Sequence, residues 1–343
     1  MCFDYFDIKS KNHFYREIFF ASDRKIFQCY NLKKFLVWEL DIIDFKKLEK
    51  ADKEIFDKFF SARYYENAEY NFTNLFMWRE MLDLRWAVED DVLFVLSANE
   101  TRIAAWQPFG AVEKMQDAIT KILSWSKENC GEKEFAFVVV EKNFVEELEK
   151  YPHAKFNITA ERESFDYVYS AQDLINLSGR KFHGKKNHLN SFRKDFPTAE
   201  YLPITAEIIP KCRDELNRWY ELHKKENPDD EFICYEQAAI HEIFDNFDDF
   251  KLKGGAILLG DKVVAFTFGE QLNSDTAVIH VEKADPSIRG AYTAINQNFV
   301  AAEWSNMTYI NREEDMGLEG LRQAKESYHP VKMIEKYFVT VVS

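Results

Sequence analysis

Two consecutive strand-to-helix turns lie within residues 276–329, and each turn places charged side chains directly after an apolar strand. The expected strands cover residues 277–281 and 308–311. The polar residues that follow are Glu282, Lys283 and Asp285 after the first strand and Arg312, Glu313, Glu314 and Asp315 after the second. Ligands of open sheets bind beyond the carboxyl ends of strands and at helix N-termini, so this stretch predicts a functional site.

The segment between these strands predicts a crossover helix. Its apolar residues recur at the spacing of one helical face, at Tyr292, Ile295, Phe299 and Ala302. A crossover helix makes the two strands parallel, and their polar ends then share one sheet edge. We therefore expect one cleft to collect Glu282, Lys283, Asn311, Arg312 and Glu313.

Length and composition favour two packed domains. The chain has 343 residues, of which 46% are hydrophobic and 16% aromatic, more than one core usually organises. Apolar runs are far shorter than a membrane-spanning helix requires, and the aromatic, charged first 36 residues do not resemble a secretory signal. The five cysteines are scattered without paired spacing, which favours a reducing, cytoplasmic location and disfavours a zinc site.

The order of expected elements repeats along the chain. Each half reads as helices, then an antiparallel hairpin, then strand, helix, strand and helix, and the last strand is expected over residues 335–342. This order predicts an α/β protein with two mixed α+β sheets. We expect an N-terminal extension over residues 1–39, a first domain over 40–163, and a second domain over 164–343 that carries the site.

The hairpin–strand–helix–strand–helix order resembles the GNAT (acyl-CoA N-acyltransferase) fold. Three segments resemble a bacterial family related to the C-terminal domain of phosphatidylglycerol lysyltransferase: DYVYSAQDLINLSGRKFHGKKNHLNSF, GDKVVAFTFGE, and HVEKADPSIRGAYTAIN followed by INREEDMGLEGLRQAKESYHP. The aromatic segment NAEYNFTNLFMW fits the first domain of the same family, and it reads either as core or as a substrate wall. The resemblance begins near residue 42, and it implies tandem GNAT-like domains and transfer of an acyl or aminoacyl group.

One motif departs from the acetyl-CoA pattern. GNAT enzymes read Arg/Gln-x-x-Gly-x-Gly/Ala where the pyrophosphate meets the helix, whereas this chain reads Ser-Ile-Arg-Gly-Ala-Tyr over residues 287–292. The central Gly290 is kept, but the bulky Tyr292 would crowd a backbone that must approach phosphate closely. Arg289 and the N–H groups around Gly290 remain candidates for holding a donor phosphate or oxyanion. No cofactor is certain; aminoacyl-tRNA and acyl-CoA are the candidate donors.

A basic stretch stands out in a chain whose formal net charge is −14. Residues 180–194 read RKFHGKKNHLNSFRK and contain no acidic side chain. Such a patch neutralises phosphates, so Lys185 and Lys186 are candidate donor-binding residues and tRNA is a candidate partner. The alternative is a solvated helix face. His183 and His188, five positions apart, do not share a helical face, so no metal site is expected.

Each candidate at the strand ends has a structural alternative. Glu282 would accept a proton from an attacking amine, or form an ion pair with Lys283 or Arg312. Tyr328 would donate a proton to a leaving group, or simply pack. The acidic cluster at 313–315 would serve the site, or cap the following helix. The remaining candidates for the acceptor side are Lys283, Asn311, Arg312, Glu313 and Lys325.

These observations favour acyl or aminoacyl transfer to an amine or hydroxyl of a small-molecule, lipid or peptide acceptor, without a metal. Two alternatives stay open: a non-catalytic module that binds a small anionic or amino-acid ligand, and an acetyl-CoA-dependent acetyltransferase. Neither a Gly-x-Ser-x-Gly elbow nor a P-loop is present in the sequence, so covalent hydrolase and NTPase functions have no support.

Overall fold

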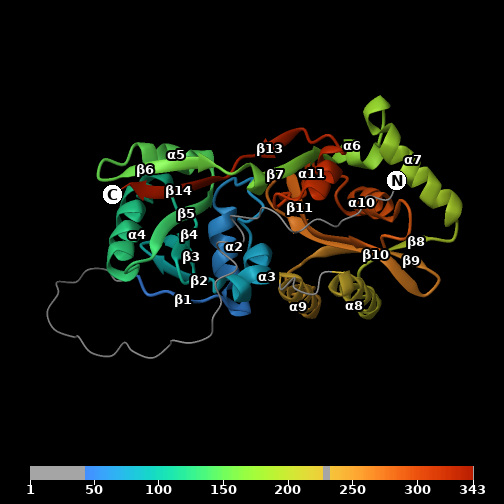
Figure 1. Cartoon of the computed structure of the whole chain (residues 1–343), viewed down its shortest axis with the longest axis horizontal. Helices are drawn as coiled ribbons and strands as arrows, with labels where there is room; N and C mark the ends of the chain where they lie inside the picture. Colours follow the sequence, from blue (N-terminus) through green and yellow to red (C-terminus); the bar gives the residue numbers. More distant parts are fainter. Residues whose placement is uncertain (1–42, 227–231, 343) are drawn as a thin grey trace. The chain divides into compact units, whose positions relative to one another are not determined.

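A computed structural model describes residues 43–226 and 232–342 of the chain (Figure 1). The described residues divide into two compact units. Unit 1 contains residues 63–78, 162–226 and 232–335, and unit 2 contains residues 43–62, 79–161 and 336–342. The two units are not contiguous in sequence. Residues 63–78, from the first half of the chain, belong to unit 1, and residues 336–342, at the end of the second half, belong to unit 2. The expected extension over 1–39 lies outside the described residues.

Unit 2 is built on a seven-stranded sheet in the order β1-β2-β3-β4-β5-β14-β6. Its strands are β1 (Lys46–Lys47), β2 (Arg85–Glu89), β3 (Val92–Ala98), β4 (Arg102–Ala105), β5 (Glu134–Val140), β6 (Lys155–Ala160) and β14 (Tyr337–Val342). Its helices are α2 (Lys53–Ser61), α4 (Met115–Asn129) and α5 (Lys142–Glu149), and α3 (Phe72–Leu82) crosses the boundary between the units. Of the paired strands, β4 and β5 are parallel and their neighbours antiparallel.

Unit 1 is built on a second seven-stranded sheet in the order β8-β9-β10-β11-β12-β7-β13. Its strands are β7 (Asp166–Ser170), β8 (Glu200–Pro203), β9 (Lys253–Leu259), β10 (Lys262–Gln271), β11 (Thr276–Ala284), β12 (Tyr309–Asn311) and β13 (Lys332–Ile334). Its other helices are α6 (Ala171–Asn176), α7 (His183–Asp195), α8 (Ile209–Glu226), α9 (Phe232–Asp245), α10 (Ala291–Glu303) and α11 (Glu319–Glu326). The predicted strands and crossover helix of residues 276–311 are thus present, and β11 and β12 are parallel.

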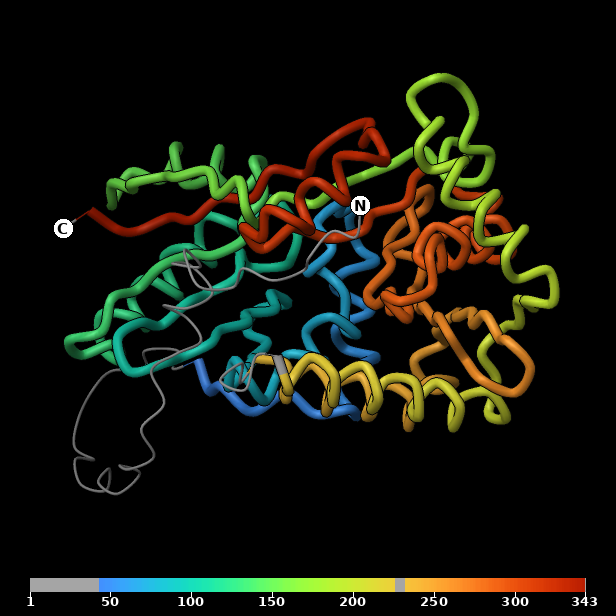
Figure 2. The backbone as a smooth tube through the Cα atoms, turned by 45° about the vertical axis from the view of Figure 1, so that its right-hand side comes forward, coloured from blue at the N-terminus to red at the C-terminus, as the bar shows by residue number. Residues whose placement is uncertain are grey.

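The two sheets share one pattern of strand directions. Read from β1 and from β8, each has three antiparallel pairings, one parallel pairing and two antiparallel pairings. The sixth strand of the unit 2 sheet is β14, the last strand of the chain, which pairs with β5 and β6. Figures 1 and 2 show β14 in red beside the green β6. The final strand therefore completes the first sheet instead of closing the second half.

Helices cover both faces of the unit 1 sheet. The α10 face carries α6, α7 and α10, and the opposite face, called the α8 face, carries α8 and α9 (Figure 1). Burial of Ala291, Ile295 and Phe299 fixes α10 on the sheet, while Tyr292 is only partly buried and Ala302 is exposed. The residue 63–78 segment joins this unit through Phe72 and Phe76, whose rings both contact the buried Phe250. This aromatic segment is thus part of the core of unit 1.

Candidate functional site

The unit 1 sheet opens where β11 and β12 part. Their parallel ladder ends at the pair Val278 and Asn311. Beyond it β11 continues to Ala284 paired only with β10, while the chain after β12 stays with β7 through a bond from the Arg312 N–H to the Tyr167 carbonyl. We call this opening the split. Because the pairing of β10 and β11 skips His280, a β-bulge there changes which side chains of β11 face each side.

On the α10 face, the split holds an ion pair between Arg312 and Glu282. The guanidinium donates to Glu282 Oε1 at 2.9 Å, and the Asn296 amide of α10 donates to Oε2 at 2.9 Å. The two charged side chains are only 12% and 11% exposed. The Arg312 guanidinium also lies over the rings of Tyr328 at 4.8 Å and Tyr169 at 5.6 Å. A charge pair so enclosed by aromatic rings interacts more strongly than one in water.

Lys185 reaches the same place from α7. Its Nζ lies 3.8 Å from the centroid of the Tyr328 ring, on which Arg312 also packs. Burial, followed by the charge of Arg312, lowers the pKa of Lys185 to about 8, while Glu282 opposes this shift. Burial likewise raises the pKa of the Tyr328 hydroxyl, against the effect of Arg312. The α10 face of the split therefore carries two cationic groups and one carboxylate, with an amine that changes charge near pH 8.

The close approach of α7 depends on Gly290, the N-cap of α10. Gly290 has φ +85°, and a Cβ added to it would lie 2.4 Å from the His188 carbonyl oxygen of α7. Only glycine accepts both this backbone conformation and this contact without displacement. Arg289, the neighbouring candidate, is exposed. The Cβ side of Gly290 is therefore occupied by α7, beside the N–H groups that were expected to hold a donor phosphate.

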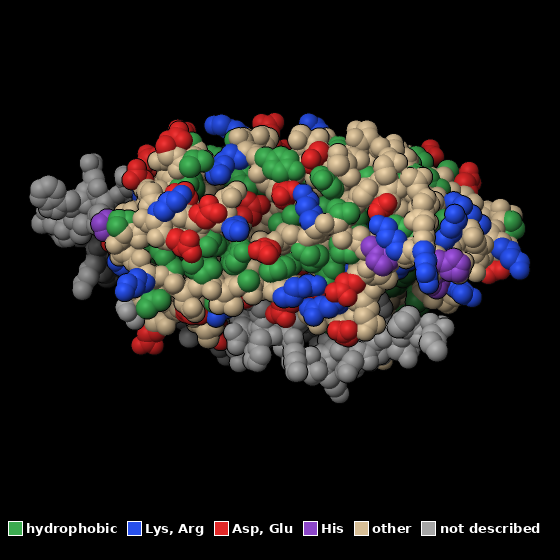
Figure 3. Space-filling model, turned by 90° about the horizontal axis from the view of Figure 1, so that it is seen from above, with side chains coloured by type: hydrophobic (Ala, Val, Ile, Leu, Met, Phe, Trp, Pro, Cys, Tyr) green, Lys and Arg blue, Asp and Glu red, His purple; other side chains and the backbone are tan. Residues whose placement is uncertain are grey.

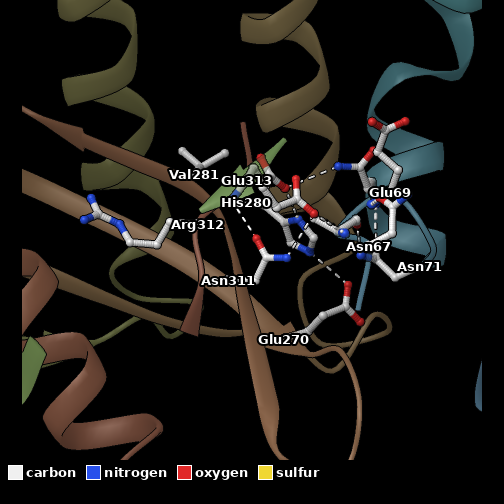
Figure 4. Close-up of polar contacts among 12 residues, drawn as sticks. Asn67, Glu69, Asn71, Glu270, His280, Val281, Asn311, Arg312 and Glu313 are labelled. Carbon is white, nitrogen blue, oxygen red and sulfur yellow. Dashed lines mark hydrogen bonds and ion pairs between the residues drawn. The ribbon is translucent and has the colours of Figure 1, made fainter. Parts of the chain in front are cut away.

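The α8 face of the split carries a second charged cluster, centred on His280 (Figure 4). The buried imidazole lies between two carboxylates, with Nδ1 3.0 Å from Glu313 Oε1 and Nε2 3.1 Å from Glu270 Oε1. Asn74 of α3 donates to the same Glu313 oxygen at 3.2 Å. Burial opposes protonation of His280, but the two carboxylates outweigh it and raise its pKa to about 9. Two carboxylates therefore flank a single imidazole in this cluster.

Asn311 and Lys283 serve contacts away from the Glu282–Arg312 pair. The Asn311 amide donates to the Glu66 carbonyl and to Asp166 Oδ2, each at 3.0 Å, and its oxygen accepts from the Glu313 N–H at 2.8 Å. Lys283 forms an ion pair with Glu236 of α9 at 2.9 Å and lies 4.0 Å from the Trp219 ring centroid. Asn311 thus holds the residue 66–68 loop, and Lys283 ties β11 to the helices of the α8 face.

Lys325 is buried beneath the loop that follows β12. Its ammonium donates to the carbonyl oxygens of Arg312 at 2.5 Å, Glu313 at 3.0 Å and Glu314. Burial lowers its pKa to about 8, although nearby acidic residues oppose the shift. Three carbonyl acceptors use all three N–H donors of the ammonium. Lys325 therefore shapes the Arg312 loop rather than presenting a free charge to a substrate.

The basic stretch forms the outer face of α7 and the turn before it. Figure 3 shows Lys, Arg and His side chains gathered where α7 lies in Figure 1. The exposed members are Arg180, Lys181, His183, Lys186, His188, Arg193 and Lys194. Lys181 pairs with Asp173 at 2.8 Å and Arg193 donates to Gln297 at 2.9 Å. Lys186 is exposed, whereas its neighbour Lys185 turns into the split, so the two candidates face different environments.

Comparison with known proteins gives the family. Residues 62–340 match the family described as phosphatidylglycerol lysyltransferase, C-terminal. The chain belongs to this family. An uncharacterised protein of Mycoplasmoides gallisepticum is 27% identical over 190 residues, which cover 55% of this chain and 60% of that protein. The match thus spans less than two thirds of that relative.

Solved structures share the fold of this lysyltransferase-family chain. A conserved protein of unknown function from Bacteroides thetaiotaomicron has a TM-score of 0.81 and 36% identity, covering 88% of this chain and all of the other. The structure described as L-PGS from Bacillus licheniformis has a TM-score of 0.59 and 15% identity, covering 84% and 91%. The expected fold class, two mixed sheets in tandem GNAT-like domains, is confirmed, as is the resemblance to the lysyltransferase C-terminal domain.

The single cleft expected from the sequence of this family member is divided in the structure. Glu282 and Arg312 meet on the α10 face, joined by Tyr328 and Lys185, whereas Glu313 faces the α8 side with His280. The expectation that all five strand-end residues converge is wrong, because the bulge at His280 and the alternation of side chains send them to different faces. The described residues contain no helix long and apolar enough to cross a membrane.

Sequence reasoning missed His280, Glu270 and Asn296, and it did not connect Asn74 of the aromatic segment with Glu313. The only sequence signal for His280 was a polar residue inside an apolar strand, at a position that alternation alone assigns to the face of Glu282. Asn74 lies more than two hundred residues before its partner Glu313. Only the tertiary fold brings such residues together.

Proposed function

We propose that this protein transfers an acyl group at the split of unit 1, with an aminoacyl-tRNA as the donor and an amine or hydroxyl as the acceptor. The observation that carries the proposal is the placement of Arg312, Glu282, Tyr328 and Lys185 where two parallel strands part. The fold of the family supports the same reading. FemX, whose chain has a TM-score of 0.54 with this one at 10% identity, adds support for the fold alone.

Acyl transfer from an ester needs an anion-stabilising group and a proton for the leaving oxygen. The attacking nitrogen or oxygen forms a bond to the carbonyl carbon, the bond to the ester oxygen breaks, and the leaving oxygen gains a proton. Arg312, held in place by Glu282, is placed to stabilise negative charge on the carbonyl oxygen. Lys185, with a pKa of about 8, is suited to give a proton to the leaving oxygen and to regain one from the nucleophile.

The charges on the two sides of the split support an assignment of substrates. The α10 face has an excess of positive charge and adjoins the basic surface of α7, which suits an anionic donor. The α8 face has an excess of negative charge around His280, which suits an amine. Opposite charges on the two faces thus favour a donor entering beside α7 and an amino group approaching from the α8 side.

The contact between α7 and Gly290 disfavours the acetyl-CoA alternative. A donor pyrophosphate at the N-terminus of α10 would compete with the α7 backbone, which lies within 2.4 Å of the Cβ position of Gly290. Tyr292, in place of a small residue, narrows the same approach. The non-catalytic alternative makes a different prediction, because a binding module would take up its ligand without releasing deacylated product.

Incubation of the full chain with a mixture of tRNAs charged with radiolabelled amino acids tests the proposal. We expect the label to move from tRNA to an added amine, phospholipid or peptide acceptor. This transfer should be faster than the spontaneous hydrolysis of the aminoacyl ester. The variant Glu282→Gln keeps the shape of the side chain and should slow transfer about 100-fold. Ligand binding without transfer would favour the binding module, and turnover with acetyl-CoA alone would favour the acetyltransferase.

A further inference from the structure

Lys185 differs from the other lysines of unit 1 in the contacts of its amine. Its Nζ faces an aromatic ring at 3.8 Å, and within residues 43–226 and 232–342 no carboxylate lies within ion-pair distance of it. The side chain is only half-buried, so the amine is not sealed inside the core. An amine that is partly desolvated and not hydrogen-bonded to an acid keeps its lone pair available for attack on a carbonyl carbon.

Burial and the charge of Arg312 favour the neutral form of Lys185, whereas the face of the Tyr328 ring favours the charged form. Arg312, from the end of β12, places a second positive charge on the same tyrosine ring. His188 is a further neighbour on α7 whose own pKa is lowered, first by burial and then by Lys185. Glu282 on β11 favours the charged form, but its carboxylate is already bonded to Arg312 and Asn296. The rigid contact of α7 with Gly290 holds the amine at this place.

We propose that Lys185 is a modification site: a nucleophilic lysine that accepts acyl groups from esters or thioesters reaching the split. The neutral amine attacks the carbonyl carbon and forms an amide bond, while the bond to the ester oxygen or thioester sulfur breaks. The proton lost by the nitrogen ends on the departing alkoxide or thiolate. The amide product carries no charge, so acylation would remove a cation from the α10 face and block the split.

Two lysines of the same chain serve as internal controls. Lys186 is the next residue on α7 and is exposed, so it reports the ordinary reactivity of a surface lysine. Lys325 has a similarly lowered pKa, but its ammonium donates to three backbone carbonyls and is buried. Faster reaction at Lys185 than at both would mean that position in the split, and not a lowered pKa alone, determines reactivity.

The experiment is a competition between lysines for a small acetyl thioester, S-acetyl-N-acetylcysteamine. The full chain is treated at pH 7.5, and acetylation of each lysine is followed over time by peptide mass spectrometry. Lys185 should be acetylated about tenfold faster than Lys186, because far more of its amine is neutral at this pH. Lys325 should remain unmodified. Equal rates at Lys185 and Lys186 would overturn the proposal, as would faster reaction at Lys325.

The variant Gly290→Ala should displace α7 and so tests whether the folded position of Lys185 determines its rate of acetylation. A second variant controls for reaction in a partly unfolded state. Gly260→Ala also places an alanine at positive φ, +61°, but nothing lies within 4 Å of its Cβ position. Only Gly290→Ala should bring the rate at Lys185 down to that of Lys186. The inference does not depend on transferase activity: rapid acetylation without transfer from tRNA would contradict only the proposed function, and transfer with slow acetylation would contradict only this inference.

Discussion

The two sheets contain equivalent parallel strand pairs, but different side chains stand where the two ladders end. In unit 2 the ladder of β4 and β5 ends at Ala105 and Phe137, and in unit 1 that of β11 and β12 ends at Val278 and Asn311. Gln107 lies two residues after Ala105, the last paired residue of β4, and His280 lies two residues after Val278, the last paired residue of β11. The same architecture therefore carries an amide in one unit and a titratable group in the other.

The consequences at the two strand ends differ. Gln107 is buried and its oxygen accepts from the Glu141 N–H at 3.1 Å, so the end of the unit 2 pair is closed by a neutral hydrogen bond. His280 instead lies between two carboxylates, and the opposite face holds the Glu282–Arg312 pair. Buried charges cost desolvation, so the charged groups at the strand ends of unit 1 support the proposal that the reaction takes place in unit 1.

The largest effect should come from Arg312→Met compared with Gln107→Met. Removing the guanidinium leaves Glu282 without its ion-pair partner, and we expect transfer to fall at least about 100-fold, with about 3 kcal/mol lost from the free energy of unfolding. Gln107→Met should cost about 1–2 kcal/mol and leave transfer within about twofold. Initial rates measure the transfer activity of both variants, and urea unfolding measures their free energies of unfolding. A folded Gln107→Met protein without activity would refute the assignment of function to unit 1.

The second comparison concerns α7. Gly290→Ala should lower the free energy of unfolding by about 3 kcal/mol, since strain and overpacking against the His188 carbonyl add together. Gly260→Ala, at φ +61° with nothing within 4 Å of its Cβ position, bears only the strain of a positive φ and should cost about 1 kcal/mol. Urea unfolding of the two variants separates these contributions. Equal costs would mean that α7 moves away freely and does not hold Lys185 in the split.

The third comparison replaces the titratable group of unit 1 by the residue of unit 2, through His280→Gln. The pKa of His280 is raised from 6.5 to about 9, so its stabilising contribution is complete below pH 6.5 and is lost as pH rises through 9. From pH 6.5 to 8 the unmodified protein should lose about 2 kcal/mol of unfolding free energy from this group. The variant should lack that decrease. Parallel stability curves for the two proteins would show that folding does not raise the pKa of His280.

The smallest effect is expected on polyanion binding. Lys186→Glu should weaken tRNA binding about tenfold and reduce the salt dependence, because a phosphate contact on α7 is replaced by repulsion. The control is Lys155→Glu on the exposed strand β6 of unit 2, which should change the affinity by less than about twofold. Fluorescence anisotropy across salt concentrations measures both. Equal losses would assign binding to overall charge, and no binding at all would leave the basic surface as a solvated face.

Sequence patterns were sufficient for the elements around the split. The apolar strands, the crossover helix and the parallel pairing follow from alternation, helical spacing and the handedness of crossovers, which act within a few tens of residues. The alternative offered for Glu282, an ion pair with Arg312, is the contact observed. The pattern failed where one extra residue enters a strand, since the bulge at His280 reverses the faces of the following side chains.

Long-range placement was beyond the sequence. Lys185 was selected for its basic neighbours, but its position over the Tyr328 ring depends on the packing of α7 against Gly290. Lys325 has the composition of a substrate-binding residue and instead supports three carbonyls of a loop. Whether a charged side chain serves a substrate or the backbone depends on a few ångströms of tertiary structure, which residue type and spacing do not encode.

The position of β14, the last strand of the chain, within the sheet of unit 2 has a consequence for folding during synthesis. Strands β5 and β6 of unit 2 are joined only through β14, which follows the whole of unit 1 in the chain. During synthesis these two strands therefore emerge long before their shared partner, and each has an edge that invites pairing with other chains. A ribosome paused within unit 1 would hold an incomplete first sheet, so slow translation of unit 1 would endanger the folding of unit 2.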